Sequence, residues 1–353
     1  MKSSLELYSY INAKLKTRLD LFIKKENLNN AIQAKTLIES FLPLRSTPFE
    51  ILEKIYSSTG DLKMAEAELF AMELNAYLEV ISLVEEPLTS FVRALARGPE
   101  IEHVKNTIRL WFDAHVRGRS IDDRTVYCYR GPTIDSFNIN KILSANNTDE
   151  VIQEFLNTSY FAVIKECLPN VVKLGTLFEL ETALDKLYYA LLEQACKNLP
   201  RSDISIAQKF IALDVDIENI ASLVRLNTFL GLRNTDIEKY LIQYEDAVSV
   251  KSLKTLYASE NIPAAALVLL GKKYAGLASL WSRGDLSSKL ATLERVLREM
   301  RNMEARKLLA GNPFSIGIII AYFILLGDEI VSVRTILNAK YYGLSEERIR
   351  SIV

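Results

Sequence analysis

Groups that carry catalysis or metal binding are scarce in this chain. Among its 353 residues are three cysteines, Cys128, Cys167 and Cys196, and two histidines, His103 and His115. The scattered cysteines form no CxxC pair and no disulfide framework, which suits a reducing compartment. Because there is no HExxH motif and no Cys/His cluster, we expect no metal site.

Nucleotide-binding and catalytic signatures are also missing. The sequence has no GxxxxGK[ST] loop and no GxGxxG motif after a predicted strand. A dyad of His115 and Cys128 has nothing in the sequence to orient it, so a chance pair is the better interpretation. We therefore expect no catalytic residue, no cofactor and no enzymatic activity of the chain's own.

A global excess of charge is absent as well. Lys and Arg number 43 against 44 Asp and Glu, a net charge of −1, which argues against nucleic-acid binding. One local basic cluster with interleaved tyrosines lies in the turn-rich residues 117–147, and Arg117 and Arg119 are its candidate interface residues. A solvated loop is the simplest interpretation, ahead of a contact with an acidic protein and of RNA binding.

Long hydrophobic runs are limited to one of 13 uncharged residues, 314–326. A membrane span needs about 20 apolar residues, so this run predicts a buried helix. Asn312 fits its N-cap, Pro313 its first position and Gly327 its left-handed end. The first residues, MKSSLELYSY, show no apolar signal-type run, and we expect a cytosolic protein.

Helical periodicity is what the sequence has in abundance. Apolar residues make up 49% and charged residues 25%, typical of a globular protein, and the length favours two or three structural units. Stretches such as LDKLYYALLEQACKNL repeat apolar residues at helical spacing. We predict an all-α fold, in which TVYCY (residues 125–129) is the best candidate for a strand.

Three stretches of the sequence resemble one another. EIEHVKNTIR (residues 100–109), DIENIASLVR (216–225) and EIVSVRTILN (329–338) are spaced 116 and 113 residues apart, about a third of the chain. LExxL segments, prolines and GL turns recur near the second spacing. These matches predict three helical repeats of about 115 residues. The expected boundaries are 1–132, 133–245 and 246–353.

The repeat supports the buried-helix interpretation of the apolar run. The counterpart of residues 313–330 in the second repeat is PRSDISIAQKFIALDVDI (200–217), with Asp203, Gln208 and Lys209. Charged residues at the centre of a membrane span cost several kcal/mol, roughly 2.5–3.5 each on insertion scales, so this counterpart cannot cross a bilayer. The apolar copy is then expected to occupy a more enclosed core position.

The repeated signature also predicts roles for its charged residues. The acids Glu100, Asp216 and Glu329 are expected where a helix begins, beside the positive end of its dipole. Arg109 and Arg225 come eight residues after the isoleucine of the signature, at the edge of the buried face. Glu181 is the candidate partner of Arg225. The third repeat has Glu294 at the corresponding position, but Asn338 replaces the arginine, so the same pair cannot form there. Bracing within a repeat is the preferred role of these residues, and a surface for a partner is the alternative.

The C-terminal residues resemble a known family. NPFSIGIIIAYFILLGDEIVSVRTILNAKYYGLSEERIRSIV is similar to the last repeat of the C subunit of bacterial and archaeal V-type and A-type ATPases, whose eukaryotic equivalent is the d subunit. DIENIASLVRLNTFLGL looks like the middle repeat. The positions that carry the resemblance are Pro313, Tyr322, Glu329, Arg334, Lys340 and Gly343.

This resemblance implies an all-helical, funnel-like subunit of pseudo-threefold symmetry. Such a subunit lies on the cytoplasmic face of the membrane, between the proteolipid rotor ring and the central shaft, and has no active site. It couples ATP turnover to proton or sodium transport, in either direction, by mechanical means. The alternative from the residues alone is a helical-repeat scaffold or adaptor of another soluble complex; an unrecognised enzyme is a third hypothesis.

Overall fold

A computed structural model describes residues 3–227, 236–274 and 289–353 of the chain. These residues form two compact units, described separately below: unit 1 contains Met1–Thr47 and Pro200–Val353, and unit 2 contains Pro48–Leu199. Within the described ranges every regular element is a helix, which confirms the all-α prediction. The threefold arrangement and the three predicted residue ranges stay predictions.

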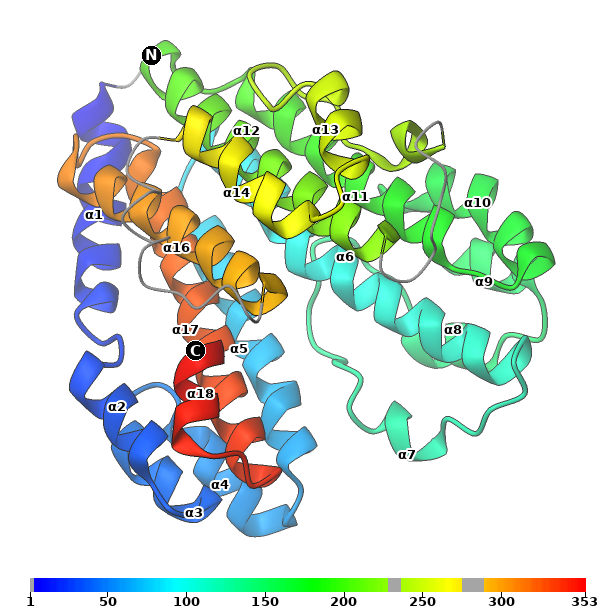
Figure 1. Cartoon of the computed structure of the whole chain (residues 1–353), viewed down its shortest axis with the longest axis horizontal. Helices are drawn as coiled ribbons and strands as arrows, with labels where there is room; N and C mark the ends of the chain where they lie inside the picture. Colours follow the sequence, from blue (N-terminus) through cyan, green and yellow to red (C-terminus); the bar gives the residue numbers. More distant parts are fainter. Residues whose placement is uncertain (1–2, 228–235, 275–288) are drawn as a thin grey trace. The chain divides into compact units, whose positions relative to one another are not determined.

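Unit 1 combines helices from both ends of the chain (Figure 1). Its elements are α1 (Ser4–Leu19), α2 (Lys25–Gln33), α3 (Leu37–Phe41), η1 (Leu42–Leu44), α12 (Arg201–Arg225), η3 (Ile237–Tyr240), α13 (Val250–Tyr257), α14 (Ile262–Lys273), α16 (Lys289–Ala310), α17 (Gly317–Tyr341) and α18 (Glu346–Ile352).

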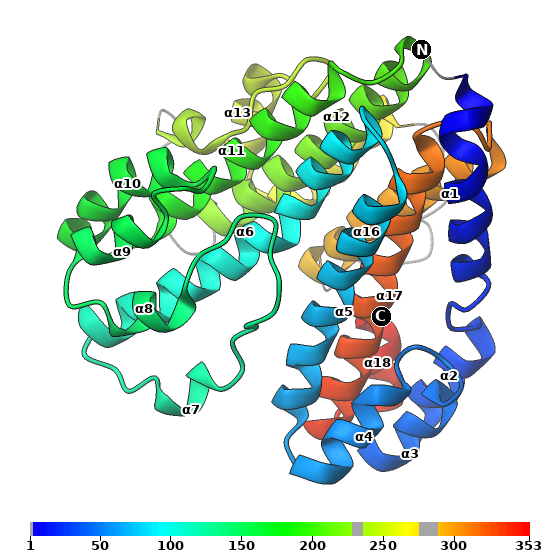
Figure 2. The same ribbon diagram turned by 180° about the vertical axis from the view of Figure 1, so that it is seen from behind.

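Helix α17 is the central helix of unit 1. It packs most extensively on α16, and α1, α3 and α12 contact it too. Figure 2 shows α1 and α16 running beside it. Side chains all around the first half of α17 are buried, and Ile318, Ile319 and Ile320 are 0–3% exposed. A helix that is apolar on every side belongs in a core, so the predicted enclosed position is confirmed.

The predicted ends of this helix are wrong. The Asn312 side chain does cap a turn, since its Oδ1 accepts the Phe314 N–H at 3.0 Å, but α17 begins at Gly317. Helix α17 also continues through Gly327, which does not have the positive φ of a left-handed residue. The helices packed against α17 keep the backbone helical at this position. Tertiary packing here outweighs the tendency of glycine to end a helix.

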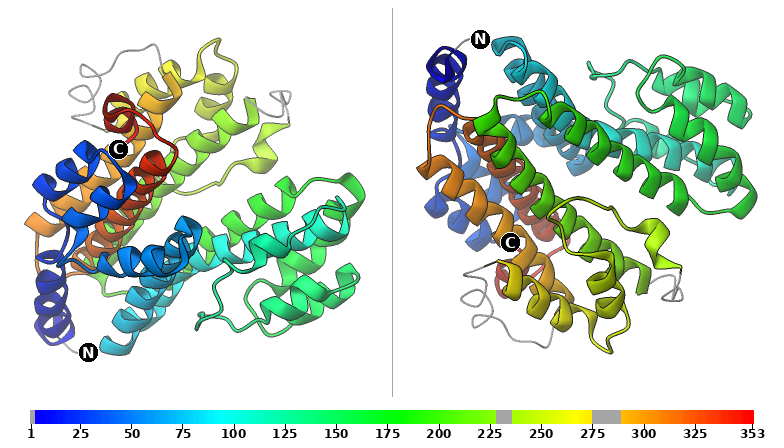
Figure 3. Two further views of the ribbon diagram at one scale, coloured as in Figure 1. Left: turned by 90° about the horizontal axis from the view of Figure 1, so that it is seen from below. Right: turned by 90° about the horizontal axis from the view of Figure 1, so that it is seen from above.

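The N-terminal segment of unit 1 packs against its C-terminal helices. Figure 3 shows the blue N-terminal helices beside the orange and red ones in both views. A small apolar cluster joins Ala31 and Ile32 of α2 to Ile336 and Ala339 of α17 and to Ile349 of α18. Lys340 also donates a hydrogen bond to the Ala34 carbonyl. Residues 1–47 therefore complete the core built by residues 200–353.

Unit 2 is built around the long helix α6. Its elements are α4 (Glu50–Thr59), α5 (Leu62–Leu83), α6 (Leu88–His115), α7 (Asp122–Thr125), α8 (Ile139–Ser144), α9 (Thr148–Glu154), α10 (Phe161–Leu174) and α11 (Phe178–Cys196). Helix α6 packs on α5, α8 and α11. Its core cluster is centred on Trp111, Phe112, Phe155 and Tyr160.

The candidate strand at residues 125–129 is wrong. Thr125 ends α7, and the Tyr127 and Cys128 N–H groups donate to the Arg124 and Thr125 carbonyls three residues earlier. These local bonds use the backbone groups that a strand needs for pairing with a neighbour. The alternation of apolar residues was too short to outweigh the turn-forming residues around it.

The repeated acids do not begin helices, contrary to the prediction. Glu100, Asp216 and Glu329 lie inside α6, α12 and α17, each more than ten residues from the helix start. The dipole argument therefore does not apply to them. Each acid lies within one long helix, because apolar residues at helical spacing continue on both sides of it. Gly231, the start of the predicted second-repeat GL turn, lies outside the described residues.

None of the described helices combines the length and the apolar character needed to cross a bilayer.

Candidate functional site

Three long helices each carry one acid of the repeated signature, and each of these acids accepts hydrogen bonds from other parts of its unit. Glu100 on α6 and Asp216 on α12 are fully buried, and Glu329 on α17 is partly buried. Removing an ionised carboxylate from water costs several kcal/mol, on the order of the desolvation penalty of an ion, unless hydrogen bonds from the protein replace those from water. The donors around each acid therefore decide what the network does.

Glu100 holds the loop that follows α7. Its carboxylate accepts hydrogen bonds from the backbone N–H of Ile134 and, at 3.1 Å, from that of Asp135. The Tyr160 hydroxyl donates to Glu100 Oε1 at 2.6 Å. Burial raises the pKa of Glu100, although these bonds oppose the shift. Burial and the neighbouring carboxylate also raise the pKa of Tyr160, so the tyrosine stays a donor.

Asp216 makes the corresponding contacts in unit 1. The Val248 backbone N–H donates to it at 2.5 Å, and Lys273 Nζ and the Tyr274 hydroxyl each donate to Oδ2 at 2.6 Å. The backbone donors follow the acids by 34 and 32 residues, and the tyrosines follow by 60 and 58. The two acids thus bind the same kinds of group at nearly the same sequence separations.

In the part of the chain that the structure describes, Glu329 accepts fewer hydrogen bonds than Glu100 and Asp216 do. The Ile23 backbone N–H, between α1 and α2, donates to its Oε1. Within the described residues no tyrosine hydroxyl or lysine is recorded as a donor to it. Burial raises the pKa of Glu329 from 4.5 to about 7, the Ile23 bond opposes this, and the adjacent Asp328 carboxylate adds to it.

Arg109 and Arg225 both form ion pairs, but the partner predicted for Arg225 is wrong. Arg109 Nε donates to Glu181 Oε1 at 2.6 Å and joins α6 to α11. Arg225 pairs with Glu218 on its own helix. Glu181, expected opposite Arg225, is therefore bound to Arg109. Glu294 is exposed on α16.

Arg117 and Arg119 converge on one carboxylate. Arg117 and Arg124 approach Asp113 to 3.1 and 3.0 Å, and Arg119 approaches it to 3.7 Å. Burial works against ionisation of this acid, but the bonds from Arg124 and Arg117 prevail and lower its pKa. The predicted basic cluster is thus partly neutralised at the end of α6.

Two aspartates on α12 act in ways that the sequence patterns did not indicate. Asp203 accepts the Tyr8 hydroxyl at 2.7 Å and the Ile316 N–H at 3.1 Å, and so joins α12 to α1 and to the start of α17. Asp214 pairs with Arg301 on α16. Acids among the buried apolar residues of α12 were the available signal, but their partners lie far away in the sequence.

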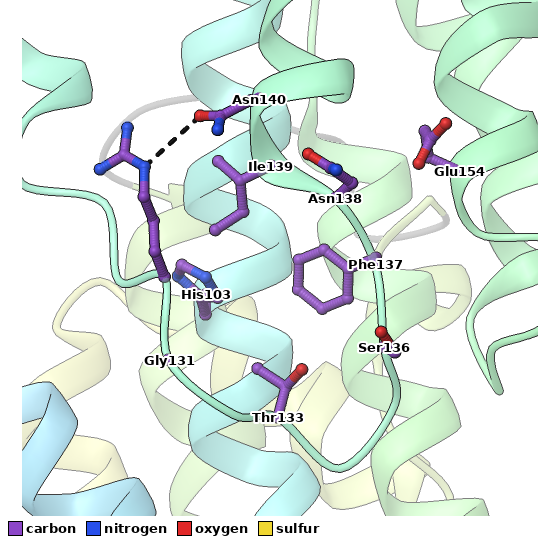
Figure 4. Close-up of a pocket in the computed structure, with 10 residues that line it drawn as sticks. His103, Gly131, Thr133, Ser136, Phe137, Asn138, Ile139, Asn140 and Glu154 are labelled. Carbon is purple, nitrogen blue, oxygen red and sulfur yellow. Dashed lines mark hydrogen bonds between the residues drawn. The ribbon is translucent and has the colours of Figure 1, made fainter.

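A pocket of about 420 Å³ lies in unit 2 beside α6 (Figure 4). His103 and Phe137 line it, together with Arg130, Ile139 and Glu154. The remaining lining residues are Gly131, Thr133, Ser136, Asn138 and Asn140. The sequence patterns did not predict this group, because a loop and three helices bring it together.

The other histidine and the cysteine considered with it have separate environments. His115 Nδ1 lies 3.1 Å from the Trp111 carbonyl, and its ring stacks on Trp111. Burial raises the pKa of the Cys128 thiol, which disfavours the reactive thiolate. Over the part of the chain that the structure describes, no three His, Cys, Asp or Glu side chains are placed to hold a metal ion.

Comparison with known proteins covers nearly the whole chain. The sequence model of the family described as ATP synthase (C/AC39) subunit matches residues 11–352. The C subunit of the A-type ATP synthase of Methanocaldococcus jannaschii is 22% identical over 348 residues, 98% of this chain and 86% of that protein. Its counterpart in Methanococcoides burtonii is 25% identical over 297 residues, 80% of this chain and 78% of that protein.

A third relative, the A-type ATP synthase C subunit of Methanothermobacter thermautotrophicus, is 22% identical over 334 residues, 94% of this chain and 84% of its own length. The match of the family and of these relatives extends through both units rather than through one of them. The chain belongs to the ATP synthase (C/AC39) subunit family.

Proposed function

We propose that this protein is a non-catalytic rotor subunit of a V/A-type rotary ATPase, which couples the membrane proteolipid ring to the central shaft. The observation that carries the proposal is the family match over residues 11–352. In this role the chain transmits rotation between ATP turnover and ion transport. It works at the cytoplasmic face of the membrane, as a peripheral component of the complex.

The buried networks support a mechanical role. A subunit that transmits torque must resist deformation, and closely packed helices provide that stiffness. Glu100 and Asp216 each connect a long helix to a loop and to a tyrosine on another element. Buried acids with hydrogen-bond donors favour one specific arrangement of helices, because any other arrangement would leave a buried carboxylate without its donors. The predicted bracing role of Arg109 and Glu181 fits the same scheme.

The test is coupled transport in a reconstituted ATPase. The complex is purified from detergent-solubilised membranes with and without this chain and placed in sealed vesicles. We expect the chain to co-purify with the proteins of the ring and the shaft. Without it, ATP hydrolysis by the soluble part should continue while ATP-driven ion uptake falls to background.

Three outcomes would contradict the proposal. Normal ATP-driven uptake in vesicles that lack the chain would show that coupling does not require it. Co-purification with a different soluble complex, and not with ring or shaft, would favour the adaptor alternative. ATP turnover by the isolated chain that a point substitution abolishes would favour an enzyme instead.

A further inference from the structure

The pocket of unit 2 has a hydrogen-bond acceptor in its wall that is buried and unused. His103 is 6% exposed, and its Nε2 atom has no hydrogen-bond partner. Figure 4 shows the His103 imidazole among the pocket residues, with Phe137 and Ile139 near it. Buried polar atoms in native proteins are nearly always paired, so an orphaned one beside a cavity points to a missing partner.

The protonation state of His103 defines what that partner must be. A hydrogen bond to the Tyr129 backbone carbonyl uses one ring nitrogen, and since Nε2 is unpaired this nitrogen is Nδ1. Burial lowers the pKa of His103 to about 4, in spite of that bond. The ring is therefore neutral at physiological pH, with the proton on Nδ1 and a lone pair on Nε2. The missing partner must donate a hydrogen.

The charges around the pocket favour an anion at its rim. Arg130 donates to the Cys128 and Thr125 carbonyls at 3.1 and 3.0 Å, and its Nε approaches Asn140 Oδ1 at 3.4 Å. These described partners are neutral oxygens, so the guanidinium keeps its positive charge. The acid among the lining residues, Glu154, is paired with Lys141 at 3.2 Å. One positive charge is therefore left uncompensated.

Aromatic and aliphatic side chains in the pocket walls offer a surface on which a planar ring can pack. The Phe137 ring lies 5.8 Å from the His103 ring, and Ile139 lines the same pocket. A volume of about 420 Å³ is far more than one water molecule occupies, about 30 Å³ in the liquid, and lies in the range of small-molecule sites.

We propose that this pocket binds a small planar anion whose ring or amino N–H donates to His103 Nε2 and whose carboxylate or phosphate lies beside Arg130. The inference rests on unit 2 alone and does not depend on the coupling role. Carboxylate and phosphate share the required chemistry, and the probes below separate them.

Nuclear magnetic resonance can test this directly, because the chain has only two histidines. The full chain is labelled with ¹⁵N-histidine, and the two rings are assigned with a His115→Gln variant. Indole-3-propionate and adenosine monophosphate are the carboxylate and phosphate probes. At least one should shift the His103 Nε2 signal saturably, in the direction of hydrogen-bond acceptance, and leave His115 unchanged.

Matched probes separate the two contacts. 1-Methylindole-3-propionate lacks the N–H donor, and 3-methylindole lacks the carboxylate. Each should bind about tenfold more weakly than indole-3-propionate, the loss expected for one buried or charge-assisted hydrogen bond. If the phosphate probe alone binds, two other compounds serve the same purpose. Purine riboside 5′-monophosphate has neither an amino group nor a ring N–H, and adenosine lacks the phosphate.

Variants provide the second control. Arg130→Gln should weaken the anionic probes about tenfold and leave their uncharged counterparts unaffected, and Arg119→Gln, outside the pocket, should change neither. Three results would overturn the proposal. The first is that neither probe shifts the His103 signal saturably at millimolar concentration. The second is that the matched compounds bind as tightly as the probes from which they derive. The third is that the Nε2 signal of the free protein already reports a hydrogen-bonded water and does not change when a probe is added.

Discussion

At the scale of single residues, the most informative groups are the three acids inside long helices. Glu100 and Asp216 are surrounded by donors, whereas Glu329 has one recorded backbone donor among the described residues. The sequence correctly singled out these positions, because they recur at a common spacing. Their role could not be predicted, since a tyrosine about 60 residues away cannot be recognised as a partner from local pattern.

Glu329→Gln should stabilise the protein at neutral and alkaline pH. Because its folded-state pKa is about 7 rather than 4.5, folding retains a proton that the unfolded chain releases. This contribution favours the folded state at low pH and is lost as pH rises from about 4.5 to about 7. Glutamine removes the cost of ionisation and keeps an acceptor for Ile23. We expect a gain of about 1–3 kcal/mol in the free energy of unfolding at pH 8.

Urea unfolding of both proteins at pH 4.5 and pH 8 measures this effect. The difference between wild type and variant should be small at the lower pH and large at the higher one. Glu100, whose pKa is also raised by burial, contributes equally to both proteins and cancels. Parallel pH profiles would contradict the assignment.

Tyr160→Phe and Tyr274→Phe should each destabilise the protein. Each change removes the hydroxyl that donates to a fully buried carboxylate at 2.6 Å, and leaves that oxygen with fewer donors. The expected loss is about 1–3 kcal/mol in the free energy of unfolding. Tyr10→Phe, at a side chain that is 62% exposed, is the matched control and should have little effect. Losses equal to that of the control would show that the hydroxyls do not brace the acids.

At the scale of elements, helix content was predictable and helix boundaries were not. Periodic apolar residues predicted the helices, and the uncharged run correctly predicted a buried one. The start at Pro313 and the end at Gly327 failed, because α17 is held by packing on α16, α1 and α12 rather than by its own punctuation. The residues Asn312, Pro313 and Gly327 indicate where this segment would start and end a helix on its own, without its packed neighbours.

Ile319→Ala in α17 should cost about 2–5 kcal/mol in the free energy of unfolding, because this side chain is fully buried and the change leaves a cavity. Val268→Ala in α14 is the control, since that side chain is 51% exposed, and we expect under about 1 kcal/mol there. Chemical denaturation of the full chain measures both. A small loss at Ile319 would indicate that the core of unit 1 collapses around the site.

The two ion pairs that join α6 to α11 should differ in strength. Lys105 is 5% exposed in its pair with Asp185, whereas Arg109 is 39% exposed in its pair with Glu181. Double-mutant cycles with alanine should give a coupling of about 1–3 kcal/mol for the buried pair. The exposed pair should give at most about 1 kcal/mol, and salt at about 0.5 M should reduce it. Equal couplings would contradict this ranking.

At the scale of the whole molecule, unit 1 is discontinuous in sequence. Residues 1–47 and 200–353 share one core, linked by the contacts of Tyr8 with Asp203 and of Ile23 with Glu329. No sequence pattern indicated this, because contacts across more than 190 residues follow no local period. Three repeats of near-equal length were predicted instead, and that division stays a prediction.

Fragments provide the test at this scale. We expect residues 48–199 to fold alone with a cooperative thermal transition, because they form a complete unit. Residues 200–353 should show no cooperative transition alone and should regain one when a peptide of residues 1–47 is added. Circular dichroism and calorimetry measure both. Cooperative unfolding of 200–353 without the peptide would show that the N-terminal helices are dispensable.

The discontinuous unit has a consequence for synthesis. Residues 1–47 leave the ribosome well before residues 200–353, yet their packing surface is complete only when the later residues have been made. At about 5–20 residues per second, the intervening unit takes roughly 8–30 s to emerge. During that time the apolar faces of α1 and α2 have no native partner, while unit 2 can already fold. We therefore expect unit 2 to fold before unit 1, and residues 1–47 to stay exposed until the last helices of the chain are made.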